Sequence, residues 1–236
     1  MIVEVLYPEV CNLCGEGANI SYLKQCCPEI EVIETDLHTR PRFLDQEVAL
    51  VYLGSATERG LQLIIDALRP LLPEIRAKIA AGQFILATGN APDALCDRIE
   101  SDTAPAMTGL GLLSGTVRYR MMTRHNSFYL GNWDGMDIVG FKSLFGFTCE
   151  STADPWFTTV RGVGRDGVAG APDGFRLDQL YATHLIGPLL VLNPPLCQWV
   201  LRKIGAPDTL AYPAAIMAAY EKRVAEFAEP NRNYMY

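Results

Sequence analysis

No apolar run in the sequence is long enough to cross a membrane. Even the stretch around Leu189 is interrupted by His184, Gly187 and Asn193, whereas a spanning helix needs roughly 18 consecutive apolar residues. The opening residues, MIVEVLYPEV, lack a basic segment and place Glu4 where a signal peptide would be apolar. These absences predict a soluble cytoplasmic protein without a membrane span.

An excess of basic residues is also lacking. Lysine and arginine together number 20 against 27 aspartates and glutamates, which gives a formal net charge of −7. The chain therefore has no overall positive field to attract nucleic acid or anionic lipid. Its seven cysteines are an odd number scattered along the chain, which is typical of reduced thiols in a cytosol rather than of a secreted disulfide framework.

The first half of the chain alternates short apolar runs with segments of helical spacing. We expect strands at 2–6, 30–35, 48–53 and 84–87, and helices at 17–25, at 58–81 and just after residue 90. Pro70 and Pro73 should divide the long helical segment into two pieces. This alternation predicts a doubly wound, mainly parallel sheet, whose functional loops follow the carboxyl ends of its strands. The loops after Leu53 and Ala87 are therefore the places to search.

The second half has a different texture. From Gly115 onward, β-rich runs separated by turn residues predict an antiparallel extension of the sheet. Residues 161–174 contain five glycines and predict a mobile loop or a hairpin tip. Helices are expected near 196–204 and 213–227. We expect one domain over 1–205, with the helix and tail of 206–236 packed on it and the tail frayed unless it docks.

Four segments follow one another in the order shown by a known protein family. They are Tyr7-Pro8 with Asn12-Leu13, Gly15-Glu16 and Asn19-Ile20; Gly109–Leu113; Val139–Phe141 with Gly146 and Thr148; and Gly187–Pro194 with Trp199 and Leu201. In these segments the chain resembles the class I glutamine amidotransferases of the cobyric acid synthase type, above all GatD, the glutaminase subunit of lipid II isoglutaminyl synthase. The resemblance implies an α/β, flavodoxin-like fold.

The resemblance also implies a reaction centre whose main groups are replaced in this chain. Release of ammonia from glutamine needs a thiolate on a tight strand-to-helix elbow, a histidine base and backbone N–H donors. FILATGNAPDAL stands where the family has a CGGYQLLG-like motif, which puts Thr88 at the nucleophile and Gly89 and Asn90 at the two glycines. ATHLIGPLLVLNP aligns with the family's GTYLHGPLLPKNP and puts Ile186 at the base. A threonine hydroxyl is far less acidic than a thiol, and an isoleucine accepts no proton.

Two other parts of the centre differ as well. The glycine-rich oxyanion loop of the family is replaced by Leu53–Arg59, in which Gly54 keeps backbone freedom but Ser55 adds a side chain. GFKSLFGF stands in place of a GFENHGG-like segment, with Ser143 and Leu144 for its polar pair. The candidate oxyanion and substrate pocket consists of Gly54, Ser55, Gly89 and Asn90.

A rearranged centre would need other side chains. His184 lies two residues before Ile186, and residues two apart on a strand share a face. Cys96, eight residues after Thr88, is the nearest thiol in the sequence, although a place on the buried face of a helix explains it better than a relocated nucleophile does. Thr88, His184 and Cys96 are thus the candidate catalytic residues.

Two further patterns have alternative interpretations. Cys11 and Cys14, with the adjacent pair Cys26-Cys27, have one chelating spacing, but adjacent cysteines do not form the usual second pair. We therefore expect no metal and no other cofactor. Arg118, Arg120 and Arg124 alternate on a strand-like run and form either a site for an acidic partner or ligand or a solvated face.

Two functional hypotheses remain open. In the first, the protein has lost glutaminase chemistry and is a binding or regulatory subunit, with a Mur-ligase-like synthetase as the partner that the resemblance implies. Glutamine or another small ligand would then occupy the degenerate pocket. In the second, a rearranged centre supplies ammonia for amidation of a cell-wall precursor or related acceptor. A third possibility is different chemistry in the old pocket.

Overall fold

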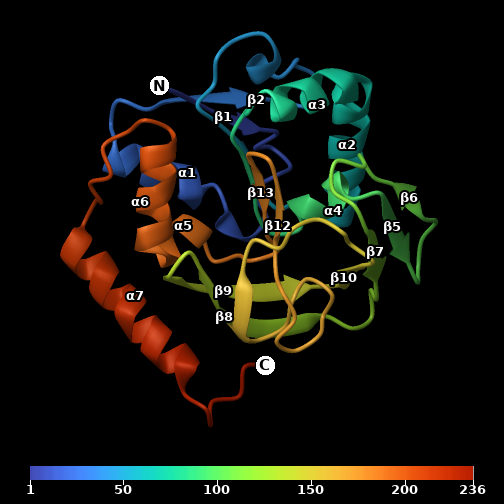
Figure 1. Cartoon of the computed structure of the whole chain (residues 1–236). Coiled ribbons are helices and arrows are strands. Elements are labelled where there is room, and N and C mark those ends of the chain that lie inside the picture. The colour runs from blue at the N-terminus through green and yellow to red at the C-terminus, as the bar shows by residue number, and fades with distance from the viewer. Residues whose placement is uncertain (236) are drawn as a thin grey trace.

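The protein is built around a six-stranded sheet (Figure 1), and the computed structural model describes residues 1–235. In spatial order the strands are β12 (Phe175–Leu177), β13 (Leu180–Ala182), β4 (Ile85–Ala87), β3 (Leu50–Leu53), β1 (Ile2–Leu6) and β2 (Glu31–Thr35). Neighbouring strands are parallel except for the pair β12–β13. The order β2-β1-β3-β4-β13 is that of flavodoxin-like, doubly wound folds, which confirms the predicted fold class.

Helices cover both faces of this sheet, as Figure 1 shows. One face carries α1 (Ala18–Cys26), α5 (Leu189–Leu192) and α6 (Pro194–Lys203), and the other carries α2 (Glu58–Leu68), α3 (Leu72–Ala80) and α4 (Ala91–Leu95). Single helical turns occur at η1 (Leu13–Gly15), η2 (Arg42–Leu44) and η3 (Arg69–Leu71). The turn η3, which contains Pro70, separates α2 from α3, so the predicted division of the long helical segment is confirmed.

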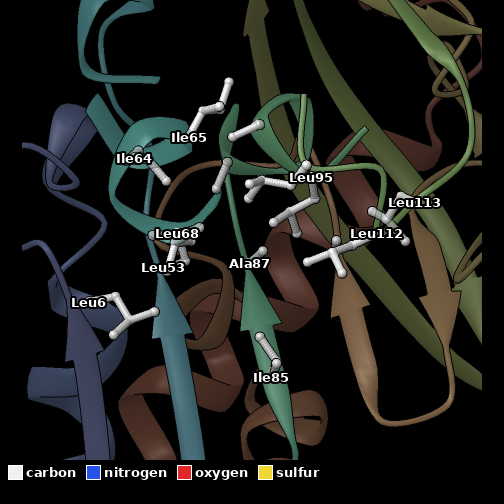
Figure 2. Packing of buried hydrophobic residues seen from close by; sticks show 14 of the residues in the cluster. Leu6, Leu53, Ile64, Ile65, Leu68, Ile85, Ala87, Leu95, Leu112 and Leu113 are labelled. Atoms are coloured by element: carbon white, nitrogen blue, oxygen red, sulfur yellow. The ribbon is translucent and has the colours of Figure 1, made fainter. Parts of the chain in front are cut away.

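Alternate residues of β3 explain why both faces are apolar. Leu50 and Tyr52 pack with the residues of α1 and α6, whereas Val51 and Leu53 pack with those of α2. Figure 2 shows the second face, where Leu53 and Ile64 point toward the same cluster of buried side chains. Burial of one such aliphatic side chain contributes about 1.5 to 3 kcal/mol, so the continuous apolar runs of the sequence are required by the two-sided packing.

The predicted antiparallel strands are present, but most of them pair in sheets of their own. One sheet has the order β10 (Gly146–Cys149), β7 (Thr116–Tyr119), β5 (Arg98–Ser101) and β6 (Met107–Thr108). A three-stranded sheet is formed by β11 (Thr158–Arg161), β8 (His125–Trp133) and β9 (Met136–Leu144). Only β12 extends the central sheet in the antiparallel sense.

The C-terminal segment lies against the three-stranded sheet. Helix α7 (Pro213–Ala228) places Phe227 on Phe128 of β8, with stacked rings whose centroids are 4.4 Å apart. The tail then docks, because Phe128 N donates to the carbonyl of Tyr234 over 3.0 Å and Arg161 donates to the carbonyl of Phe227 over 3.0 Å. Within residues 1–235, no helix combines the length and the apolar character needed to span a membrane.

Candidate functional site

The loops at the carboxyl ends of β1, β3, β4 and β13 meet at one edge of the central sheet, where doubly wound folds place their sites. They enclose a small cavity, which we call the edge pocket. Its walls include Cys14, Ser55, Gly89, Asn90, Arg124 and Ile186. The sequence placed Ser55, Gly89 and Asn90 in one pocket, and the structure brings these three together there.

The edge pocket is very small. Its volume is about 40 Å³, close to the volume of one or two water molecules. Sites for small organic ligands usually have volumes of about 300 to 1,000 Å³. An amino acid does not fit in this conformation of the pocket.

The tight turn from β4 into α4 is centred on Gly89. Its φ angle is +64°, in the left-handed region that favours glycine, whereas Thr88 does not have a positive φ. Gly89 N donates to the carbonyl of Leu185 over 3.3 Å, and Thr88 N donates to the carbonyl of Leu53 over 3.0 Å. The residue at the elbow is therefore Gly89, one position later than the sequence alignment places it.

Ser55 fills the space above this turn. A β-carbon built on Gly89 would overlap the Cβ of Ser55. Ser55 is itself fixed, because its hydroxyl donates to the carbonyl of Leu13. The side chain of Asn90 fixes the other side of the turn, accepting from Ala56 N over 2.8 Å and donating to Ala56 O over 2.7 Å. The elbow has neither a reactive side chain nor room for one.

Gly54 lies in the same loop and is not part of the walls of the edge pocket. A β-carbon at this position would overlap the carbonyl oxygen of Cys11. Glycine is thus needed at position 54 for a close backbone approach between the loops after β1 and β3.

Thr88 is fully buried beneath the turn and belongs to a polar network. Its hydroxyl lies 2.7 Å from the hydroxyl of Tyr52, which in turn donates to the backbone carbonyl of Glu16 over 3.1 Å. Glu16 Oε1 accepts from Gly187 N over 3.1 Å, and Asn19 Nδ2 donates to the Tyr52 hydroxyl over 2.9 Å. This network joins the loops after β1, β4 and β13, and it leaves Thr88 without access to the edge pocket.

Burial controls the ionisation of the network. It raises the pKa of Glu16, although hydrogen bonds from Thr88 and Gly187 oppose the change. It also raises the pKa of the Tyr52 hydroxyl well above its ordinary value. Tyr52 therefore stays protonated at neutral pH and is no base for Thr88.

His184 is buried and paired with Asp93. Its Nε2 lies 2.7 Å from Asp93 Oδ1, and Tyr119 donates to Asp93 Oδ2 over 2.6 Å. The Nδ1 atom has no hydrogen-bond partner among residues 1–235, and the imidazole packs edge-on against Phe175 with 5.8 Å between ring centroids. His184 is outside the walls of the edge pocket, whereas Asp93 and Tyr119 contribute to them.

Cys96 is also buried, and it packs in the apolar cluster beneath α2 and α4. Burial raises the pKa of this thiol far above its ordinary value, with a further contribution from the nearby charge of Asp93. A thiol in such surroundings is not a nucleophile at neutral pH. Within the described chain, no side-chain hydrogen bond joins any two of Thr88, His184 and Cys96.

Ile186 occupies the wall of the edge pocket beside the elbow. Its backbone pairs with Phe141, with Ile186 N donating to Phe141 O over 2.9 Å, and this pairing fixes its position. Ser143 and Leu144 complete the same wall. Ile186 stands at the place where the resemblance requires a base, and its side chain cannot accept a proton.

The cysteines do not form a metal centre in the part of the chain that the structure describes. No group of three or more His, Cys, Asp or Glu side chains in residues 1–235 has an arrangement suited to a metal ion. Cys11 is buried and Cys14 is exposed, and all seven cysteines are free thiols. Cys26 accepts a hydrogen bond from Ala211 N over 3.3 Å.

Sequence reasoning missed Glu16, Tyr52 and Asp93 as members of buried polar networks. Tyr52 lies in an apolar run, and Asp93 lies 91 residues from His184, so neither has a local signal. Glu16 was noticed only as part of a motif, and it lies ten residues beyond the end of β1, after the turn η1.

Two solved structures resemble this chain over most of its length. A glutamine amidotransferase superposes with a TM-score of 0.56 at 17% sequence identity and covers 87% of this chain and 100% of its own. A glutamine amidotransferase from Thermotoga maritima superposes with a TM-score of 0.51 at 10% identity, over 97% of this chain and 93% of its own. No protein-family model matches the sequence, and no curated protein matches it significantly. The chain therefore has the fold of glutamine amidotransferases.

Proposed function

We propose that this protein is a GatD-like relative of the class I glutamine amidotransferases that has lost glutaminase activity and acts as a binding or regulatory subunit. The single observation that carries the proposal is the elbow after β4, where Gly89 has a positive φ and Ser55 fills the space above it. A thiolate at the elbow is the group that glutamine hydrolysis needs.

Three further observations support the same conclusion. Ile186 stands beside the elbow where the resemblance requires a histidine. Thr88 and Cys96 are both buried, and neither lines the edge pocket. The edge pocket, at about 40 Å³, has no room for glutamine, so a ligand of that size needs a rearranged loop.

The alternative is an active amidotransferase with a rearranged centre. The observation in its favour is the Asp93–His184 pair, because a carboxylate that orients an imidazole is a recurring part of catalytic centres. Among residues 1–235 the second ring nitrogen of His184 has no hydrogen-bond partner, so no nucleophile is paired with it. The pair is therefore better explained as a buried structural element.

An assay of ammonia release from glutamine tests the proposal. We expect the wild-type protein to release no more ammonia than a heat-denatured sample, and we expect Thr88→Ala and Cys96→Ala to leave this background unchanged. Turnover that is abolished by either substitution would overturn the proposal and establish the rearranged centre.

We further propose a Mur-ligase-like synthetase as the partner and the cytoplasm as the location. The partner is implied by the GatD-like motifs, and seven free thiols suit a reducing compartment. Co-expression with a Mur-ligase-like protein encoded next to this chain should give one stable complex on size exclusion. Separate elution of the two proteins would contradict the partner.

A further inference from the structure

A second cavity lies next to the edge pocket and shares Arg124 and Phe145 with it. We call it the arginine pocket. It is formed by Arg118 and Arg120 at the end of β7, Arg124 and His125 at the start of β8, and Phe147 of β10. Its volume is about 560 Å³, within the usual range for small-molecule sites.

Two of the three guanidinium groups have no carboxylate partner among residues 1–235. Arg118 is paired with Glu150 at 2.8 Å and with Glu100 at 3.6 Å. Arg124 lies over the ring of Phe145, 4.4 Å from its centroid, and forms no ion pair in the described chain. Arg120 forms no side-chain hydrogen bond or ion pair there. Uncompensated arginines at one place are notable in a chain with a net charge of −7.

No aspartate or glutamate of the described residues lines the arginine pocket. Its other polar lining residues are Thr123, His125, Asn126 and Asn233, none of which is a carboxylate. The Oδ1 atom of Asn126 already accepts from Ser143 over 2.8 Å, and that of Asn233 accepts from Met235 N over 3.2 Å. Their amide nitrogens are therefore the groups that remain for a ligand, and they are donors.

The walls of the pocket are held in place by the fold. Arg120 N donates to the carbonyl of Phe145 over 2.7 Å, and His125 Nε2 lies 2.9 Å from the hydroxyl of Ser127. The tail is docked beside Ser127 through backbone pairing of Met235. These contacts fix the backbone from which the arginines project, whereas the side chain of Arg120 becomes ordered only when a ligand binds.

We propose that the arginine pocket binds a small phosphorylated ligand, with the phosphate held between Arg120 and Arg124. The planar guanidinium fork matches a phosphate in geometry, and two uncompensated cations match the charge of about −1.5 to −2 that a phosphate monoester carries. The ring of Phe147 offers an apolar surface next to these cations. This site is independent of the lost glutaminase chemistry, because it rests on none of the residues at the elbow.

Isothermal titration calorimetry of the full chain with pyrophosphate tests the site, in about 0.15 M NaCl to screen weak surface binding. We expect saturable binding that Arg120→Gln weakens about tenfold or more, consistent with the loss of one charge-assisted contact of about 1.4 kcal/mol or more. Arg202→Gln is the matched control, because Arg202 is half exposed and paired with Asp208 at 2.8 Å far from the pocket. We expect this control to bind like the wild type.

Ribose 5-phosphate and inorganic phosphate form two further arms of the experiment. Tighter binding of the ester identifies an organic phosphate as the ligand class, whereas tighter binding of the inorganic anion identifies free phosphate, and both results support the site. The proposal would be overturned if none of these phosphates bound saturably at concentrations up to about 10 mM. A dissociation constant of about 10 mM corresponds to a binding free energy of about −2.7 kcal/mol. Equal weakening by Arg120→Gln and Arg202→Gln, or equal affinity for succinate and pyrophosphate, would also overturn the proposal.

Discussion

Gly89 and Ser55 meet across the turn that follows β4, with no space between them for a β-carbon on Gly89. The contact is made by two loops that lie next to each other because β3 and β4 are neighbouring parallel strands. A cysteine at the elbow would carry about 1 to 2 kcal/mol of backbone strain and would need a smaller residue at position 55. The contact between Gly89 and Ser55 therefore both excludes a side chain from the elbow and narrows the edge pocket.

Substitution of Gly89 by alanine should destabilise the protein strongly. The left-handed φ costs about 1 to 2 kcal/mol for a residue with a β-carbon, and overlap with Ser55 adds about 1 to 3 kcal/mol. Gly82→Ala is the matched control, since Gly82 has a φ of +91° but no atom within 4 Å of an added β-carbon. The free energy of unfolding in urea should fall more for Gly89→Ala than for Gly82→Ala. Equal losses for the two variants would contradict the steric part of this account.

Removal of the ionisable group at position 16 should change how stability depends on pH. Burial raises the pKa of Glu16 above its ordinary value of 4.5, so the folded state keeps this proton to higher pH than the unfolded chain does. The stability contributed by this group is therefore fully present below pH 4.5 and is lost as the pH rises from there through the folded-state pKa.

Glu16→Gln cannot ionise and should lack this decline. The unfolding free energy of the wild type minus that of the variant should therefore decrease as the pH rises. Thermal or urea unfolding over a pH series measures the difference, and the exposed Glu47→Gln serves as a control that should follow the wild type. Parallel profiles for the wild type and Glu16→Gln would show that the carboxyl group is not buried as described.

The Asp93–His184 pair should contribute to stability as a unit. Removal of either partner leaves the other buried without its hydrogen bond, so Asp93→Ala and His184→Ala should each cost about 2 to 4 kcal/mol. The double variant should cost less than the sum by about 1 to 3 kcal/mol, because the two residues share one interaction. A double-mutant cycle by urea unfolding measures this coupling, and additive losses would argue against it.

The thiols should differ in reactivity. Cys14 is exposed, and Cys26 is half-buried with a pKa lowered by a hydrogen bond from Cys197, so a maleimide should modify both in the folded protein. Cys96 should stay unmodified until the protein unfolds, because it is buried and its pKa is raised. Peptide mass mapping after timed labelling distinguishes the sites. Rapid labelling of Cys96 in the folded protein would revive it as a candidate nucleophile.

Local patterns in the sequence were sufficient to predict the first four strands of the central sheet and the helices that connect them. The continuous apolar run at 50–53 reflects burial on both faces, and Pro70 and Pro73 marked the break between α2 and α3. The pairing of the later strands was not predictable in this way, because β7 pairs with β5 in the parallel sense and with β10 across an intervening hairpin. Partner choice depends on contacts between distant residues, and no local pattern records them.

The edge pocket was predictable only in part, since Ser55, Gly89 and Asn90 line it and Gly54 does not. The candidate catalytic residues Thr88, His184 and Cys96 also lie outside its walls. The apolar run FILA contains no residue that fixes its register, so an alignment of this segment cannot decide whether Thr88 or Gly89 occupies the turn. The positive φ of Gly89 identifies it as the residue at the turn. The partners of Thr88 were hidden for another reason. Tyr52 lies 36 residues away in an apolar strand, and nothing in its surroundings there distinguishes it from a core aromatic residue.

Reaction of the folded protein with an electrophilic glutamine analogue, followed by intact-mass spectrometry, tests the central claim most directly. A diazo ketone analogue binds in place of glutamine and alkylates a nucleophile that lies next to it. We predict that no glutamine-protected adduct forms, because the residue at the elbow, Gly89, has no side chain to alkylate. One glutamine-protected adduct that maps to Thr88 or Cys96 would contradict the account.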